Sequence, residues 1–292
     1  MKYLEKHPML MIAVGIMGIS LSSIFVKYSQ APSAVTAAWR LLWTVLLMSP
    51  VVFGKQQVRS QLRQIGKKTL LLSLLSGLFL AAHFALWFES LQHTSVASST
   101  TIVCTEVIWV ALGFCVFLKG KLSPKALAAI GVTLAGSILI AWADSSSGGN
   151  HFYGDVLALL AAVTVSVYML IGRVVRTNVS TTVYTYLVYL SCAGALLLLC
   201  AFRGEGLTGH GFSAPVVGLL LAVFSTILGH SIFSWCLRFF SPAFVSASKL
   251  CEPVVAALLA GFLFQEIPTA MQLLGGALIL GGVFYYSRLE KA

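Results

Sequence analysis

Long runs of apolar residues alternate with short polar segments along the whole chain of 292 residues. A run of about 20 apolar residues, coiled as a helix, crosses the ~30 Å hydrocarbon layer of a membrane. Because lipid offers the backbone no hydrogen-bond partners, such runs are expected to be helical throughout. The pattern predicts an all-α integral membrane protein with ten transmembrane helices, at residues 9–27, 33–53, 69–89, 95–117, 125–143, 154–172, 180–202, 213–235, 242–264 and 269–287.

The same pattern occurs twice. Residues 84–142, moved forward by half the length of the chain, coincide with residues 230–288 without a gap. Glu106 then meets Glu252, and other small and polar residues also coincide. Self-similarity at a fixed spacing indicates that one structural unit has been duplicated.

The number of spans in each copy predicts how the copies are related. Residues 1–146 and residues 147–292 each contain five predicted spans, and an odd number turns the second copy upside down in the membrane. The connecting loops agree, because residues 117–125 contain three Lys, whereas their counterpart, residues 263–269, contains no Lys or Arg and one Glu. We therefore expect two inverted five-helix repeats, the arrangement of many secondary transporters, with a binding site near the midplane.

Composition and charge give the orientation. The chain is 58% hydrophobic and 10% charged, whereas a soluble domain is about 25% charged. Of its 19 Lys and Arg, fifteen fall on one side of the predicted membrane and two, Lys27 and Arg203, on the other. The positive-inside rule makes the crowded side cytoplasmic, so both termini are predicted inside, in a bacterial cytoplasmic membrane. The net charge of +10 is then a topology signal, and no nucleic-acid partner is expected.

The first apolar run also suits a signal peptide, because Lys2 and Lys6 precede it. Against this reading, the repeat aligns residues 9–27 with the sixth predicted span. We therefore expect the first run to be retained as a span.

Several residues resemble the pattern of a known family. Glu252 is followed by Pro253, Glu266 stands in the next loop, and the last span is rich in glycine. Together with Arg40 in the second span, this pattern resembles the EamA domain of the drug/metabolite transporter superfamily, in two copies over nearly the whole chain. The resemblance implies a ten-helix transporter with a central cavity, usually exporting small metabolites. The first copy departs from the pattern, since Val107 stands where the second copy has the proline.

Four charged residues stand well inside predicted spans: Arg40, Glu106, Lys249 and Glu252. A charge at the centre of the bilayer costs about 2.5–3.5 kcal/mol on insertion scales, so it needs a partner or a water-filled cavity. Lys249 and Glu252 are three residues apart and share one face of a continuous helix. They form either a structural ion pair or part of a translocation pathway. We predict that all four residues bind substrate or ion.

Pro253 is predicted to be a hinge, because proline removes a helical hydrogen bond and kinks the helix. Glu106 is followed by Val107 and is expected to lack such a bend. We add three aromatic residues to the predicted substrate site: Trp109, Tyr168 and Tyr186. Tyr186 occupies the position equivalent to Arg40, whereas Trp109 also suits ordinary packing. Trp87, at the end of a span, is expected to be an interfacial anchor.

These observations favour a secondary active transporter that exports small metabolites, such as amino-acid-like compounds, by alternating access. No Walker A sequence is present, so coupling to a gradient is expected, with a proton carried by Glu252 or Glu106 as the candidate. The alternatives are an intramembrane enzyme and a passive channel or scaffold, but no HExxH or GxSxG motif supports catalysis. Six cysteines stand in apolar runs without ligand spacing, so no metal or cofactor is expected. The oligomeric state stays open.

Overall fold

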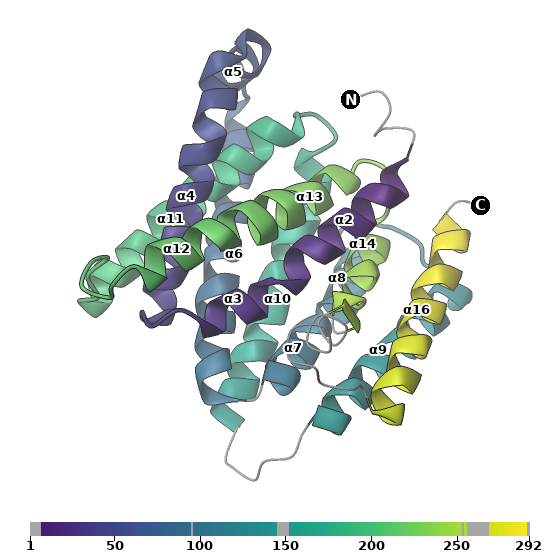
Figure 1. Cartoon of the computed structure of the whole chain (residues 1–292). Coiled ribbons are helices and arrows are strands. Elements are labelled where there is room, and N and C mark those ends of the chain that lie inside the picture. Colours follow the sequence, from purple (N-terminus) through teal and green to yellow (C-terminus); the bar gives the residue numbers. More distant parts are fainter. Residues whose placement is uncertain (1–6, 95, 145–151, 253, 256–268, 291–292) are drawn as a thin grey trace.

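The computed structural model describes residues 7–94, 96–144, 152–252, 254–255 and 269–290, which are helical with short connections and include no strand (Figure 1). The helices are α2 (Pro8–Ser20), α3 (Ser22–Lys27), α4 (Ser33–Gly54), α5 (Gln56–Arg63), α6 (Lys67–His93), α7 (Val96–Cys104), α8 (Glu106–Val116), α9 (Pro124–Asp144), α10 (Phe152–Val175), α11 (Thr181–Arg203), α12 (Ser213–Leu220), the π-helix η1 (Leu221–His230), α13 (Ser231–Cys236), α14 (Pro242–Lys249) and α16 (Ala270–Glu290).

Local chemistry explains where several helices begin and end. At the start of α11 the hydroxyl of Ser180 accepts a hydrogen bond from the N–H of Val183, and at the start of α14 Ser241 does the same for Phe244. These hydroxyls satisfy backbone donors that have no partner within the helix. α11 ends at Gly204, whose φ of 68° is a left-handed conformation that glycine adopts without steric cost.

The described residues include seven helices that are long and apolar enough to cross a membrane. Two shorter apolar helices, Pro124–Leu139 and Leu273–Leu289, match the predicted fifth and tenth spans. The predicted ninth span, residues 242–264, begins as α14, and most of its remainder lies outside the described residues. The all-helical membrane class is therefore confirmed, whereas the count of ten spans stays a prediction.

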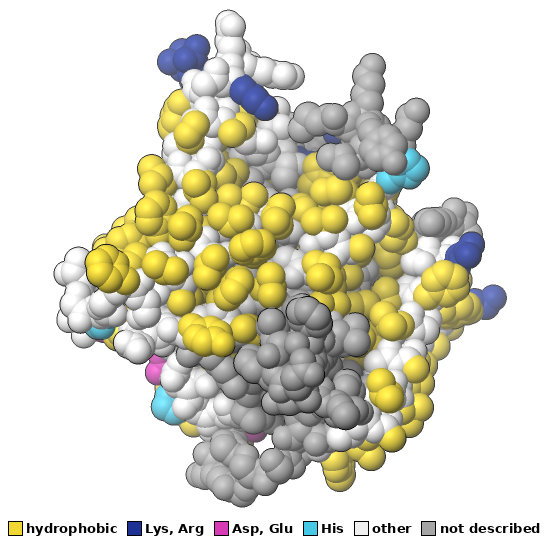
Figure 2. Space-filling model, viewed as in Figure 1, with side chains coloured by type: hydrophobic (Ala, Val, Ile, Leu, Met, Phe, Trp, Pro, Cys, Tyr) yellow, Lys and Arg dark blue, Asp and Glu magenta, His cyan; other side chains and the backbone are white. Residues whose placement is uncertain are grey.

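The surface suits a hydrocarbon environment. Hydrophobic side chains cover the middle of the face seen in Figure 2, and Phe202 and Phe212 are 91% and 88% exposed. Soluble monomers rarely expose apolar patches larger than a few hundred Å². The Lys and Arg side chains visible on this face lie toward the end of the molecule where α5 and the last turn of α16 lie (Figures 1 and 2).

Helices α9 and α16 pack closely and run antiparallel. A Cβ on Gly136 of α9 would lie 2.6 Å from the carbonyl oxygen of Gly275 and 2.8 Å from Cγ1 of Ile279. A Cβ on Gly282 of α16 would lie 2.5 Å from Cγ2 of Thr133. The later position on one helix thus meets the earlier position on the other. Gly136 and Gly282 are matched positions of the sequence repeat, so each copy supplies a glycine for this close approach.

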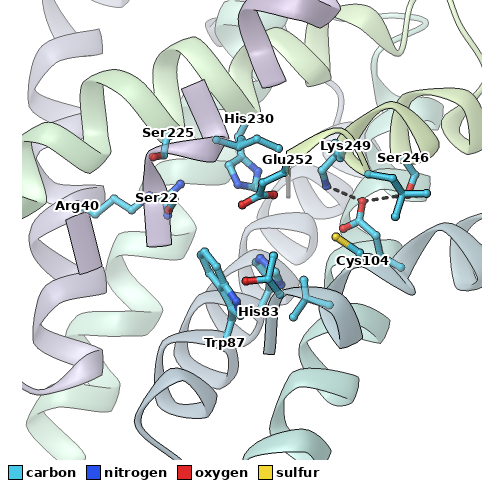
Figure 3. Close-up of a pocket in the computed structure, with 15 residues that line it drawn as sticks. Ser22, Arg40, His83, Trp87, Cys104, Ser225, His230, Ser246, Lys249 and Glu252 are labelled. Carbon is cyan, nitrogen blue, oxygen red and sulfur yellow. Dashed lines mark hydrogen bonds and ion pairs between the residues drawn. The ribbon is translucent and has the colours of Figure 1, made fainter. Parts of the chain in front are cut away.

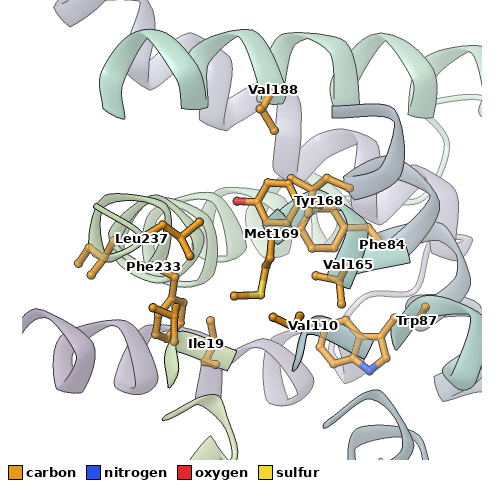
Figure 4. Close-up of a cluster of buried hydrophobic side chains, with 14 of the residues drawn as sticks. Ile19, Phe84, Trp87, Val110, Val165, Tyr168, Met169, Val188, Phe233 and Leu237 are labelled. Atoms are coloured by element: carbon orange, nitrogen blue, oxygen red, sulfur yellow. The ribbon is translucent and has the colours of Figure 1, made fainter. Parts of the chain in front are cut away.

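The apolar core lies where α6, α8, α10 and α13 meet (Figure 4). Phe84, Val110 and Met169 are at most 2% exposed there, and Phe233 is 4% exposed. Helix α10 packs along α6, and α2 packs along η1; these two pairs consist of matching segments of the repeat. This core holds rigidly the helices that carry the polar residues described next.

Candidate functional site

Two helices are interrupted at matching points, and each interruption carries a carboxylate. Helix α7 ends at Cys104, Thr105 forms a turn, and α8 begins at Glu106. Helix α14 ends at Lys249, and after a turn of two residues helical structure resumes at Glu252. Glu106 and Glu252 are the matched positions of the sequence repeat. Discontinuous membrane helices of this kind form the substrate and ion sites of many secondary transporters.

Tighter turns explain both interruptions. The N–H of Thr105 donates to the carbonyl of Ile102 (3.0 Å), and its hydroxyl donates to the same oxygen (2.6 Å). The N–H of Cys251 likewise donates to the carbonyl of Ser248 (3.2 Å). The expectation that the helix carrying Glu106 lacks a bend is therefore wrong, because this turn needs no proline. Pro253, the predicted hinge, lies outside the described residues.

Two further helices are irregular beside these turns. Helix α2 ends at Ser20 and α3 begins at Ser22, so the first predicted span is also interrupted. The long helix made of α12, η1 and α13 contains ten residues of π-helix, Leu221–His230. π-Helical turns are rare and frequently occur at functional sites. Sequence periodicity did not predict either irregularity.

A cavity of about 40 Å³ lies among these irregular segments. Its lining comes from α2, α3, α4, α6, α7 and α8 of the first sequence repeat and from η1, α14 and Glu252 of the second. The four charged residues predicted for the site all line it: Arg40, Glu106, Lys249 and Glu252. Figure 3 labels Arg40, Lys249 and Glu252 among the lining residues. The structure thus brings these four together, and their binding of substrate or ion stays a prediction. The volume has room for a few water molecules but not for a metabolite.

Lys249 and Glu106 form an ion pair across the cavity wall. The Nζ atom of Lys249 lies 2.6 Å from Oε1 of Glu106, and the hydroxyl of Ser246 donates to the same oxygen (2.9 Å). The two charged side chains are 12% and 4% exposed. The pairing of Lys249 with Glu252, considered from the sequence, is not present among the described residues, because α14 ends at Lys249 and the helical spacing does not continue.

Arg40 is fully buried and only partly paired. Its Nε donates to the hydroxyl of Thr226 (2.7 Å), and its Cζ lies 4.0 Å from the centre of the Phe84 ring. Neither Nη atom has a hydrogen-bond partner among the described residues. Within the same part of the chain, Glu252 has no ion pair or hydrogen bond to its carboxylate. Arg40 is buried and Glu252 is partly buried, whereas buried charged groups are normally paired, so Arg40 marks an unusual site.

Four other polar groups of the cavity lining are buried without a partner in the described structure: Ser22 Oγ, Ser225 Oγ, Thr100 Oγ1 and Trp87 Nε1. Sequence reasoning missed them. Trp87 was expected to be an interfacial anchor, but it is 6% exposed and stacks on His83 in the cavity wall. Ser and Thr in membrane helices commonly bond to their own backbone, as Ser20 does, so the sequence carries no signal for the exceptions.

The three predicted aromatic site residues lie elsewhere. Trp109 is 36% exposed on α8 and does not line the cavity. Tyr168 is buried in the core, where its hydroxyl lies 2.8 Å from that of Ser234. The hydroxyl of Tyr186 lies 3.2 Å from that of Ser49, between α11 and α4. The geometry therefore does not bring these aromatic residues into contact with the charged cluster, and their role in binding stays a prediction.

His83 and His230 also line the cavity, and their ring centres are 6.4 Å apart. Nδ1 of His83 lies 3.0 Å from the carbonyl oxygen of Ala161, which orients that ring as a donor toward α10. Among the described residues, no group of three or more His, Cys, Asp or Glu side chains is arranged to hold a metal ion.

Comparison with known proteins agrees with this architecture. The model of the EamA-like transporter family matches the chain twice, over residues 7–142 and 152–288. An uncharacterized transporter of Archaeoglobus fulgidus is 24% identical over 85% of each chain. The uncharacterized transporter YxxF of Bacillus subtilis is 24% identical over 89% of this chain and 82% of its own length. A solved crystal structure has the same fold, with a TM-score of 0.78, 19% identity and 98% coverage of both chains.

Proposed function

The chain belongs to the EamA-like transporter family and is an integral membrane transporter, and we propose that it is a secondary active exporter of small, amino-acid-like metabolites. It would work by alternating access to the cavity lined by Arg40, Glu106, Lys249 and Glu252. One observation carries this proposal. Both copies of the repeat interrupt a membrane helix at the same position, and both interruptions border one cavity between the copies.

We further infer ten spans in two inverted repeats, residues 1–146 and 147–292. The antiparallel packing of α9 on α16 supports the inversion, since these helices match in the sequence repeat. In an inverted repeat, each helix and its mate run in opposite directions through the membrane. The distribution of Lys and Arg supports cytoplasmic termini and a bacterial cytoplasmic membrane.

The small volume of the cavity supports a transport cycle with large movements. A metabolite needs a pocket of several hundred Å³, and the cavity of about 40 Å³ must expand to admit one. The pair between Lys249 and Glu106 joins the two copies, so opening toward one side would break it or carry it along. Both interruptions lie beside the cavity, and helices bend most readily where their regular hydrogen-bond ladder is broken.

Export against a gradient requires an energy source, and we propose a proton carried by Glu252. Its carboxylate lines the cavity without an ion pair or hydrogen bond among the described residues, whereas Glu106 is already neutralised by Lys249. A carboxylate in this position exchanges protons with whichever side the cavity faces. Protonation would remove its charge and change its attraction for a bound cation.

Counterflow tests the proposed function. Liposomes containing the purified protein are preloaded with the twenty standard amino acids and diluted into a radiolabelled mixture of the same compounds. We expect transient accumulation of label, abolished by Glu252→Gln together with Arg40→Gln and unchanged by Glu205→Gln, a matched change outside the cavity. Folded protein that accumulates no more label than empty liposomes would contradict the proposal. Equal entry of label with and without preloading would indicate a passive channel.

A further inference from the structure

The guanidinium of Arg40 is a buried cation aimed at the cavity and lacking an anionic partner. Its residue is 0% exposed, and Nη1 and Nη2 have no hydrogen-bond partner in the described part of the chain. Its single polar contact, from Nε to Thr226, is with a neutral hydroxyl. A guanidinium presents a planar fork of donors that matches the two oxygens of a carboxylate. The free edge of this fork is therefore suited to an oxyanion.

Two hydroxyls complete the same region of the cavity. Ser22 on α3 and Ser225 on η1 are 3% and 0% exposed, and neither hydroxyl has a partner among the described residues. Figure 3 shows Arg40, Ser22 and Ser225 together on one side of the cavity. Three helices from both copies thus supply donors to the same side of the cavity. Hydroxyls and a guanidinium can all donate to a single carboxylate.

The carboxyl group of Glu252 lines the same cavity. Glu252 is drawn between Arg40 and Lys249 in Figure 3, and no ion pair in the described structure joins it to either residue. Lys249 is occupied by Glu106, at 2.6 Å. Among the described residues of the lining, the guanidinium of Arg40 and the carboxyl group of Glu252 therefore remain without a direct ion pair. A ligand with both charges would satisfy both residues at once.

We propose that the cavity binds a zwitterionic α-amino acid, with its carboxylate on Arg40, Ser22 and Ser225 and its ammonium toward Glu252. This inference rests on the proposed transport function and specifies how the substrate is held. The remaining lining includes Ile19, Val103 and Leu250, which favours an apolar side chain. A phosphate ester fits less well, because its second negative charge would meet the carboxylate of Glu252.

Matched compounds test each half of this assignment. Purified protein is titrated with leucine, with isoamylamine, which lacks the carboxylate, and with isocaproate, which lacks the ammonium; phenylalanine, phenethylamine and hydrocinnamate form a second set. Binding is followed by the shift in melting temperature, which rises with the ratio of ligand to Kd. We expect at least one of the two amino acids to bind about tenfold or more tightly than both of its analogues, as loss of a charged hydrogen bond implies.

The variants should separate the two ends of the ligand. The Arg40→Gln variant should bind the amino acid no more tightly than the amine. The Glu252→Gln variant should bind the amino acid no more tightly than the carboxylic acid. Ser225→Ala should weaken the binding of the amino acid and of the carboxylic acid, but not the binding of the amine. Ser137→Ala removes a hydroxyl that is equally buried and unpartnered but lies outside the cavity, and it should change nothing. If Arg40→Gln does not fold, Arg40→Lys, which keeps the charge and loses the fork, serves in its place.

Several results would overturn the inference. The inference is wrong if neither amino acid binds to the wild-type protein, or if an analogue binds as tightly as its amino acid. It is also wrong if the Arg40→Gln variant still binds the amino acid more tightly than the amine. Counterflow then distinguishes the two proposals. If a compound without a carboxylate is transported, and Arg40→Gln transports it equally well, the zwitterion proposal is wrong and the transporter proposal stands. If the expected binding pattern is found but no counterflow occurs, the transporter proposal is wrong and the binding-site proposal stands.

Discussion

The ammonium of Lys249 and the carboxylate of Glu106 lie 2.6 Å apart, although 143 positions separate them in the chain. Lys249 stands at the end of α14 and Glu106 at the start of α8, so each copy of the repeat supplies one charge at an interruption of a helix. The pair is nearly inaccessible to solvent, and Ser246 donates a further hydrogen bond to it. Among the described residues it is therefore the most buried ion pair between the two copies.

Breaking this pair from one side should destabilise the protein strongly. Lys249→Met leaves a buried carboxylate without its cation, and removal of one partner of a buried pair costs about 3–5 kcal/mol. The double variant Lys249→Met with Glu106→Gln should recover most of this loss. The free energy of unfolding in a denaturant series gives the coupling between the two positions. Additive losses in the double variant would show that the two residues do not interact.

The exposed pair of Arg203 and Glu89 provides the control for this cycle. Its atoms lie 3.5 Å apart, and the side chains are 40% and 26% exposed. Surface pairs contribute about 0–1 kcal/mol, so Glu89→Gln should leave the free energy of unfolding nearly unchanged.

Arg40→Met should stabilise the protein while abolishing binding of an anionic group. The substitution removes a buried charge with two unpartnered nitrogens and keeps an apolar side chain against Phe84. Replacing buried charges with apolar residues often raises stability, here by about 1–3 kcal/mol. Melting temperature and substrate binding are measured on the same preparation. A large fall in melting temperature would instead identify Arg40 as a structural residue.

Much of this arrangement could be predicted from the sequence, and the rest could not, for identifiable reasons. Apolar runs must be helical in lipid, and charged residues are rare inside a membrane. The helical class and the four charged residues of the cavity could therefore be predicted from the sequence. The sequence could not show which charged residues pair with each other. The spacing of Lys249 and Glu252 places them on one face only if the helix is continuous. The turn at Thr105 has no proline or glycine to announce it.

The unpartnered hydroxyls could not be predicted either. Ser22 and Ser225 look like many other small polar residues in the apolar runs, and only the tertiary arrangement leaves them without a partner. The role of Trp87 was misjudged for a related reason, because its place near the end of a run suggested the interface. A π-helix such as η1 leaves no periodic signal in a run that is apolar throughout.

Glu252→Gln should uncouple transport from the proton gradient. The amide cannot bind or release a proton, so the variant should exchange substrate across the membrane yet fail to concentrate it when a pH gradient is imposed. In the variant, the rate of substrate exchange should also lose the pH dependence that comes from titration of Glu252. The measurement is uptake of the radiolabelled amino-acid mixture into liposomes with and without a pH gradient. Normal concentration by Glu252→Gln would transfer the proton-carrying role to Glu106.

Matched loops should face opposite sides of the membrane if the copies are inverted. Ser60 and Gly206 are matched positions in exposed connections. In a protein whose one exposed described cysteine, Cys115, is replaced, Ser60→Cys should react with an impermeant thiol reagent only from the cytoplasm. Gly206→Cys should react only from outside. Labelling of both from the same side would rule out the inverted arrangement.

Access to the cavity from both sides is the central claim, and Ser225→Cys tests it directly. The cysteine is introduced after replacement of Cys104 and Cys115, and an impermeant methanethiosulfonate is applied to right-side-out and inside-out vesicles. Alternating access predicts modification from each side, whereas Ser137→Cys, buried outside the cavity, should be modified from neither. Modification of Ser225→Cys from one side alone, or from neither, would contradict the account.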